Sequence, residues 1–162
     1  MIKLDASSLI YAVKANYLPL LKELYGSLIV IDTVYEEVVT RGKQARKRDA
    51  YVLEKMIEEE ILKRHPDAKK PPKVPLGKGE IAVIYSAKQE NCKALIDDQK
   101  ARKVAVQNDV DVKWTSLAFL VALKTNLITD VEFDELLTKF VQVANPSIIE
   151  YKTILEMKKL MK

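Results

Sequence analysis

The chain has 162 residues, of which 48% are hydrophobic and 31% are charged, a composition typical of one globular domain. Its net charge of +4 permits a polyanionic partner, whereas its single cysteine, Cys92, excludes an intramolecular disulfide bond and a zinc site built from cysteines. No run of about 18 apolar residues is present and Asp5 comes too early for a signal peptide. We therefore expect a cytoplasmic protein that makes no membrane contact.

Short apolar runs that end at a carboxylate alternate with longer segments of helical period. Residues 2–5, 28–32 and 94–97 have the composition of buried strands, and residues 110–114 form a weaker fourth candidate. Such alternation of strands and helices predicts an α/β fold of three layers, α/β/α, around a mostly parallel sheet of four or five strands.

Two stretches and the C-terminal part depart from this rhythm. Residues 41–48 carry five basic side chains and no acid, and residues 65–75, predicted to be a loop, hold four of the six prolines. We interpret residues 41–75 as a basic and proline-rich helical insertion in a domain of residues 1–128. The purely helical pattern of residues 129–162 predicts a C-terminal extension that packs on the same domain. The broad apolar surface of the last helix fits docking either on this domain or on a second subunit, as in a homodimer.

Acidic residues cluster where the predicted strands end. Asp5 follows the first strand, Asp97 and Asp98 follow the third, Glu37 lies in the helix after the second, and Glu80 begins another helix. Because the carboxyl ends of parallel strands share one sheet edge, these carboxylates are expected to gather and to repel one another unless a cation neutralises them. Oxygen donors suit Mg²⁺ or Mn²⁺, and one or two such ions suit the hydrolysis of a phosphodiester.

Each acid also has a purely structural interpretation. Thr33 and Glu36 have the spacing of a capping box, which would leave Glu37 for the site. One of Asp97 and Asp98 is expected to serve as the N-cap of the following helix. A carboxylate at a helix start also offsets the helix dipole without binding any ligand.

Four strings, taken in chain order, resemble the motifs of PIN domains, and in particular those of small prokaryotic VapC-like ribonucleases: IKLDASSLI (2–10), VYEEV (34–38), LGKGE (76–80) and LIDDQKAR (95–102). The resemblance implies an endoribonuclease that depends on Mg²⁺ or Mn²⁺. It also implies that the catalytic and metal-binding residues are Asp5, Glu37, Glu80 and Asp98, with Asp97 as the reserve. The chain departs from the family pattern after the fourth strand, where residues 112–116 include no acid and Trp114 is followed by Thr115 and Ser116.

Two functions are compatible with these residues. The resemblance implies a ribonuclease, as in the toxin of a toxin–antitoxin pair whose antitoxin covers the cleft. The missing acid directly after Trp114 and the broad apolar surface of the last helix favour the alternative, a non-catalytic PIN-like module that binds RNA or protein.

Several residues are candidates for contact with an RNA substrate. Arg46 and Lys47, in the basic run, either hold RNA phosphates or lie on a solvated turn. Arg102 either contacts a phosphate or pairs with a neighbouring acid. Thr115 and Ser116 either bind the ion through water or cap the next helix.

Overall fold

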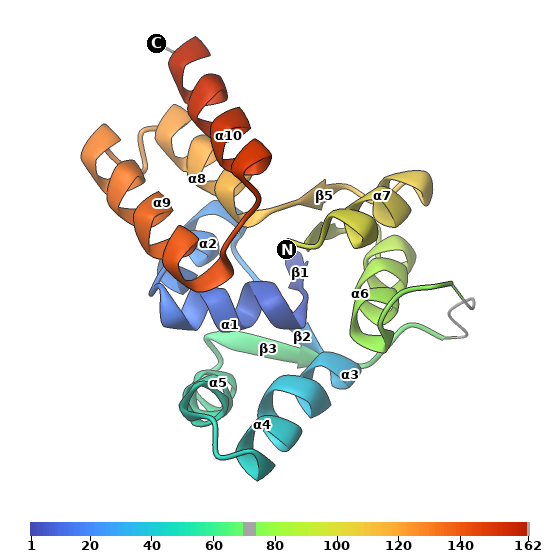
Figure 1. Cartoon of the computed structure of the whole chain (residues 1–162). Coiled ribbons are helices and arrows are strands. Elements are labelled where there is room, and N and C mark those ends of the chain that lie inside the picture. Colours follow the sequence, from blue (N-terminus) through green and yellow to red (C-terminus); the bar gives the residue numbers. More distant parts are fainter. Residues whose placement is uncertain (70–73, 162) are drawn as a thin grey trace.

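The computed structural model describes residues 1–69 and 74–161, and within them five strands form one sheet. The strand order is β3-β2-β1-β4-β5, and every neighbouring pair is parallel (Figure 1). The strands are β1 (Ile2–Leu4), β2 (Leu28–Ile31), β3 (Leu62–His65), β4 (Lys93–Leu95) and β5 (Val112–Lys113). The predicted α/β class with a parallel sheet is confirmed.

The strand β3 differs from the sequence prediction, which treated residues 41–75 as a helical insertion with a loop from residue 65 onward. Its residues pair in register with all of β2, from Leu28 opposite Leu62 to Ile31 opposite His65. Only Leu62 is buried, whereas Lys63 and Arg64 are exposed, because β3 is at the edge of the sheet. Charged side chains are common on edge strands, and they hide the apolar signal that revealed the buried strands.

Helices cover both faces of the sheet. Helix α6 (Lys78–Gln89) packs on β1, β2 and β4 with α7 (Gln99–Gln107) beside it. Helices α1 (Ala6–Lys14) and α2 (Leu18–Tyr25) lie on the other side of the strands (Figure 1). The helices are α1 (Ala6–Lys14), α2 (Leu18–Tyr25), α3 (Asp32–Tyr35), the π-helical turn η1 (Glu36–Thr40), α4 (Arg41–Gln44), α5 (Arg48–Glu58), α6 (Lys78–Gln89), α7 (Gln99–Gln107), α8 (Thr115–Lys124), α9 (Asp130–Ala144) and α10 (Ile148–Leu160). None of the described helices is both long and apolar enough to span a membrane.

An ion pair between a buried lysine and an exposed glutamate connects α6 to the centre of the sheet. Lys3, in the middle of β1, is completely buried, and its Nζ atom lies 2.5 Å from Oε1 of Glu90, directly after α6. A buried charge is tolerated only when it is paired, so this contact fixes where the C-terminal end of α6 lies. The opposite end of the same helix carries Glu80.

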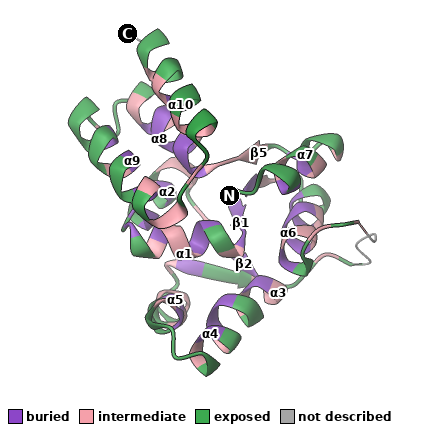
Figure 2. Cartoon of the chain, viewed as in Figure 1, coloured by how far each residue is buried: buried purple, intermediate pink, exposed green. Residues whose placement is uncertain are grey.

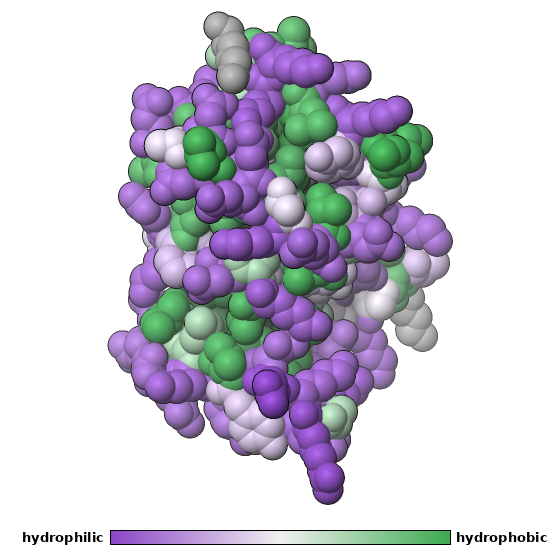
Figure 3. Space-filling model, turned by 60° about the vertical axis from the view of Figure 1, so that its left-hand side comes forward, coloured by the Kyte–Doolittle hydropathy of each residue, from purple (hydrophilic) through white to green (hydrophobic). Residues whose placement is uncertain are grey.

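The C-terminal helices belong to the same hydrophobic core as the sheet. Phe133, Leu137 and Phe140 of α9 and Ile154 of α10 are buried, and they join one cluster with the strand residues (Figure 2). The outer surface of the molecule contrasts with this core. The face shown in Figure 3 is mostly hydrophilic, with separate hydrophobic patches between hydrophilic side chains. Residues 129–161 are therefore held to the sheet domain by apolar contacts.

This packing predicts that damage to α9 destabilises the whole molecule. Phe133→Ala should lower the free energy of unfolding by about 3–5 kcal/mol, the usual cost of removing a buried aromatic side chain. Val131→Ala is the matched control on the same helix, because Val131 is 67% exposed and its truncation should change stability by less than about 0.5 kcal/mol. Urea denaturation measured by circular dichroism checks both. A main unfolding transition unchanged by Phe133→Ala would contradict a shared core.

Candidate active site

The strand order reverses direction between β1 and β4, and two aspartates lie at this point. From β1 the chain proceeds outward to β2 and β3 on one side, while β4 and β5 occupy the other side. Asp5 directly follows β1, and its backbone N–H donates to the carbonyl oxygen of Leu95, the last residue of β4, at 3.2 Å. The crevice at such a switch point is where open α/β sheets bind their ligands.

Asp5 is held by the first turn of α1. It is the N-cap of this helix, and its Oδ1 atom accepts a hydrogen bond from the Ser8 backbone N–H at 2.7 Å. Only 3% of the residue is exposed. Burial, followed by the nearby Asp97 carboxylate, raises the pKa of Asp5 to about 7, and Glu80 adds a smaller effect in the same direction.

Asp97 is fixed by hydrogen-bond donors from two other elements. Its Oδ2 atom accepts from the hydroxyl groups of Ser8 at 2.9 Å and Thr115 at 2.8 Å, and its Oδ1 atom accepts from the Thr115 backbone N–H at 2.8 Å. Burial raises the pKa of Asp97 although these donors and Arg102 oppose the rise. Ser8 therefore joins the two acids, with its N–H on Asp5 and its hydroxyl on Asp97.

A buried tyrosine extends this network. The Tyr17 hydroxyl lies 3.2 Å from Oγ1 of Thr115, and Tyr17 is only 1% exposed. Because the Thr115 hydroxyl proton is directed to Asp97, Tyr17 is the donor in this contact. Hydrogen bonds thus run from the buried Tyr17 through Thr115 to Asp97, and together with Ser8 they fix the orientation of the Asp97 carboxylate.

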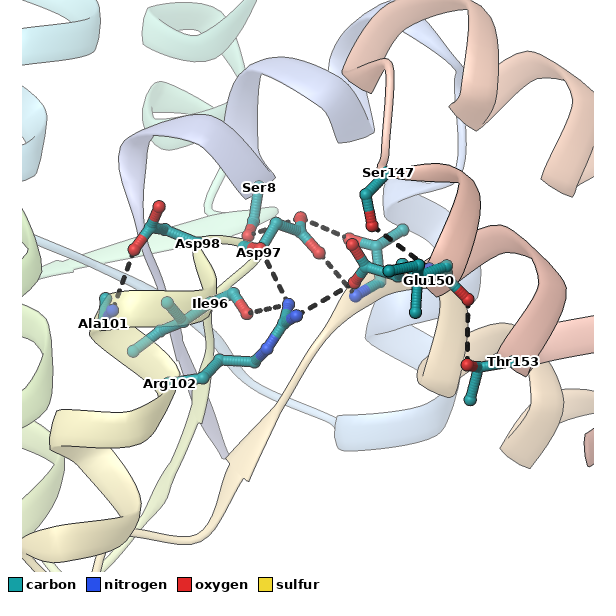
Figure 4. Close-up of polar contacts among 11 residues, drawn as sticks. Ser8, Ile96, Asp97, Asp98, Ala101, Arg102, Ser147, Glu150 and Thr153 are labelled. Carbon is teal, nitrogen blue, oxygen red and sulfur yellow. Dashed lines mark hydrogen bonds and ion pairs between the residues drawn. The ribbon is translucent and has the colours of Figure 1, made fainter.

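Asp97 and Asp98 have separate tasks. The exposed Asp98 accepts the Ala101 backbone N–H at 2.8 Å and is the N-cap of α7, which confirms that one of the two residues caps this helix. In Figure 4 the Asp98 side chain turns toward Ala101, while Asp97 turns toward Ser8. The sequence placed the ligand at Asp98 with Asp97 in reserve, but the structure brings Asp97 beside Asp5.

Glu37 and Glu80 line a cleft that opens onto Asp5. This cleft, of about 430 Å³, is also lined by Ser7, Thr33, Arg41 and Lys78. Glu80 lies in the first turn of α6, and its Oε2 atom accepts the Gly77 backbone N–H at 2.8 Å. Glu37 lies on the π-helical turn η1, and π-turns inside helices occur frequently at functional sites.

Gly79 allows Glu37 to approach α6. The Oε2 atom of Glu37 lies 2.9 Å from the point that a Cβ atom at position 79 would occupy. Any side chain at this position would push the Glu37 carboxylate away, so the glycine keeps two walls of the cleft close together.

The expected capping box of Thr33 and Glu36 is wrong. The Thr33 backbone N–H and hydroxyl donate instead to the two carboxylate oxygens of Asp67, at 3.0 and 2.6 Å, and Glu36 is exposed. Asp67 comes from the loop after β3, so a residue 34 positions away in the sequence takes the capping role. Glu37 nevertheless faces the cleft, as expected.

Of the basic run, the structure brings Arg41 into the cleft. Arg46 and Lys47 lie in the turn between α4 and α5 and do not line it. Lys78, at the start of α6, is a second cation at the cleft that the sequence analysis did not select. Its position directly before Gly79 and the candidate ligand Glu80 is the sequence feature that could have marked Lys78 as a cleft residue.

The other predicted substrate contacts have structural partners instead. Arg102 pairs with Glu150 at 3.0 Å and donates to the Asp97 carbonyl oxygen at 2.7 Å (Figure 4). Its guanidinium group also lies over the Trp114 ring. This ion pair confirms the structural alternative for Arg102. Thr115 and Ser116 are buried and do not reach a substrate from this position, and Thr115 holds Asp97 rather than capping its own helix.

A family model described as DUF3368: PIN domain matches residues 1–148. The chain belongs to the PIN domain family. Proteins of this family are typically nucleases and typically bind divalent metal ions. A comparison with curated proteins found no match.

Solved structures share the PIN fold with this chain at low sequence identity. A domain of a functionally unknown protein from Methanocaldococcus jannaschii is 14% identical, with a TM-score of 0.51, over 70% of this chain and 89% of that one. A PilT N-terminus domain protein from Sulfolobus solfataricus is 15% identical, with a TM-score of 0.51, over 75% and 92%. The PIN domain endonuclease Utp24 is 10% identical, with a TM-score of 0.51, over 70% and 84%. These likenesses establish the fold.

The donor atoms of the PIN domain site fit a hard divalent cation. Asp5 is buried and Asp97 is half-buried beside it, the Asp97 carboxylate raises the pKa of Asp5, and Glu37 and Glu80 supply further oxygens across the cleft. Within residues 1–69 and 74–161, however, no three acidic, histidine or cysteine side chains lie close enough together to form a metal cluster as they stand. Asp5 and Asp97 are thus the pair that most needs neutralisation.

The raised pKa of Asp5 predicts a pH-dependent stability of the metal-free PIN domain. The pKa is about 7 in the folded state against 3.8 for the ordinary group, so the contribution of Asp5 to stability is fully present below pH 4 and is lost as the pH rises to 7. Asp5→Asn keeps a good N-cap and removes the charge, so at pH 8 it should stabilise the protein by on the order of 2–4 kcal/mol. Urea denaturation in EDTA at pH 5 and pH 8 measures this, and the gain should be smaller at pH 5. A variant less stable than the parent at pH 8 would contradict the assignment.

The network behind Asp97 predicts a difference between two adjacent hydroxyl groups. Thr115→Val removes a hydroxyl donor to the half-buried Asp97 carboxylate and should cost about 1–3 kcal/mol of unfolding free energy at pH 8. Ser116→Ala is the matched control, because the buried Ser116 hydroxyl has no hydrogen-bond partner in the described part of the chain. Tyr17→Phe should cost about 1 kcal/mol, since it removes one neutral donor and keeps the ring. Equal effects of the Thr115 and Ser116 variants would contradict the network.

Proposed function

We propose that this PIN domain is an endoribonuclease that depends on Mg²⁺ or Mn²⁺ and hydrolyses RNA phosphodiester bonds. The observation that carries the proposal is the pair Asp5 and Asp97, a buried and a half-buried carboxylate that lie together at the strand-order reversal. Keeping two like charges together in a poorly solvated place is unfavourable, and a bound cation relieves it. The site is therefore built for an ion rather than for stability alone.

The residues divide into cation ligands and groups that act on water or phosphate. Asp5 and Asp97 would bind the ion, with Glu37 and Glu80 as further ligands or as groups that orient the attacking water. The chemistry that a divalent cation supplies at such a site is the activation of water and the neutralisation of charge on the phosphate. Arg41 and Lys78, on the same cleft, supply positive charge for the flanking phosphates.

Adjacent aspartates make a sharp test of this proposal. End-labelled single-stranded RNAs incubated with Mn²⁺ should be cleaved, and EDTA or Asp5→Asn should stop the cleavage. Asp97→Asn should reduce the rate by at least about 100-fold because it removes a ligand charge. Asp98→Asn should stay within about 10-fold of the parent, since asparagine also caps a helix well.

Two results would count against the proposal. One is cleavage that persists in EDTA and in Asp5→Asn, which would point to a contaminating nuclease. The other is an inactive Asp98→Asn beside an active Asp97→Asn, which would return the ligand role to Asp98. As the toxin of a toxin–antitoxin pair, the ribonuclease would slow growth when expressed alone, and expression of Asp5→Asn is the control for that role.

One observation favours a second candidate function, a PIN module that holds RNA or protein without cleaving it. In the described ranges no three of the acids converge into one group around a possible metal position. Such a module would bind Mn²⁺ weakly or not at all. Calorimetric titration of the protein with Mn²⁺ decides between the two, because a saturable isotherm lost in Asp5→Asn supports the nuclease.

A further inference from the structure

A second cavity, of about 630 Å³, lies beside the acidic cleft. It is bounded by α1, the start of α7 and the turn between α9 and α10, which are far apart in the sequence. Ser7 lines both cavities, and Asp97 forms part of the wall of the second. A ligand in this cavity would therefore contact Asp97 and lie beside the cleft that Asp5 lines.

The walls of this second cavity combine a ring with amide groups. Tyr11 is half-buried, and the buried Phe140 supports it edge-on, with ring centroids 6.0 Å apart at an angle of 79°. Gln99 and Asn145 bring side-chain amides that both donate and accept hydrogen bonds. A flat aromatic wall with amides beside it is the combination that recognises unpaired bases, by stacking and by contacts to their edges.

The charge of the second cavity differs from that of the acidic cleft. Asp97, Asp98 and Glu150 line it, and Lys100 is the basic residue among its lining side chains. The acidic cleft also has three carboxylates, those of Asp5, Glu37 and Glu80, but it sets two cations, Arg41 and Lys78, beside them. A phosphate is repelled by carboxylates, whereas an uncharged base with amino donors is not, so the two cavities suit different parts of a nucleotide chain.

An ion pair holds the walls of the second cavity together. Arg102 of α7 and Glu150 of α10 are 3.0 Å apart, with side chains only 14% and 17% exposed. Arg102 also donates to the carbonyl oxygens of Ile96 and Asp97, just before α7 (Figure 4). The cavity is thus formed before any ligand binds, and α10 is fixed relative to the acids.

We propose that the second cavity binds one nucleobase of the RNA, adjacent to the phosphate that lies over Asp5 and Asp97. The base stacks on Tyr11, and Gln99 and Asn145 contact its edge. That the ligand is RNA rests on the proposed function, but the base site itself requires no cleavage. The C-terminal helices α9 and α10 would then determine which nucleotide is preferred at one position of the substrate.

Binding of abasic RNA tests the proposal without any cleavage. The full chain carrying Asp5→Asn is titrated, in Mg²⁺, against a labelled eight-nucleotide RNA and against versions that each lack one base. Fluorescence anisotropy should show that loss of the base at one position weakens binding at least 5-fold, because a stacked base contributes about 1–3 kcal/mol. Loss of bases elsewhere should have smaller effects.

Variants of the walls connect the abasic effect to this cavity. Tyr11→Leu should weaken binding of the intact RNA at least 5-fold and remove the effect of the abasic position, while Tyr11→Phe should stay within about 2-fold. Tyr85→Leu is the matched control, since Tyr85 is also half-buried and lines neither cavity. Asn145→Gly should reduce the preference among the four bases, because glycine keeps the backbone φ of 47° while removing the amide.

Three results would overturn the base site: equal binding of all abasic RNAs, an abasic effect that persists in Tyr11→Leu, or no measurable binding of any RNA. An abasic effect that depends on Tyr11, found in a protein that does not cleave RNA with Mn²⁺, would support the base site and reject the proposed nuclease. Cleavage that is insensitive to substitution of Tyr11 and to the loss of any base would support the proposed nuclease and reject the base site.

Discussion

The reversal of strand order between β1 and β4 is the constraint on which the site depends. It makes the carboxyl ends of two neighbouring strands the starting points of α1 and α7, which leave toward opposite faces of the sheet. The acids at these starting points, Asp5 and Asp97, therefore stay together with no helix between them. Ser8 binds both through its N–H and its hydroxyl, so the first turn of α1 holds the pair.

Holding these carboxylates together costs stability, and the surrounding structure limits that cost. Burial raises the pKa values of both acids, while the donors Ser8 and Thr115 oppose the rise. Tyr17 continues the hydrogen bonds into the core, where the rigid packing of Phe119 and Phe140 surrounds its ring. Carboxylates with strongly raised pKa values are typical of ligand-binding and catalytic sites, and the proposed cation would stabilise their charged form.

The C-terminal helices connect the core to the site. Phe140 of α9 packs on Tyr11 and Tyr17. Glu150 of α10 pairs with Arg102, which also donates to the carbonyl oxygen of Asp97. The turn between these helices thereby becomes a wall of the second cavity, whose charge and aromatic character differ from those of the acidic cleft. Helices that add apolar contacts to the sheet domain thus also shape the surroundings of its acids.

The sequence alone determined the buried strands β1, β2 and β4 and the presence of Asp5, Glu37 and Glu80 near one sheet edge. These features depend on local order, because a short apolar run that ends at a carboxylate is visible within a few residues. The edge strand β3, the choice of Asp97 over Asp98, the capping of Thr33 by Asp67 and the pairing of Arg102 with Glu150 were decided only by the tertiary structure. Each of these depends on a partner far away in the sequence, and hydrogen bonds between distant residues leave no periodic signal in the chain.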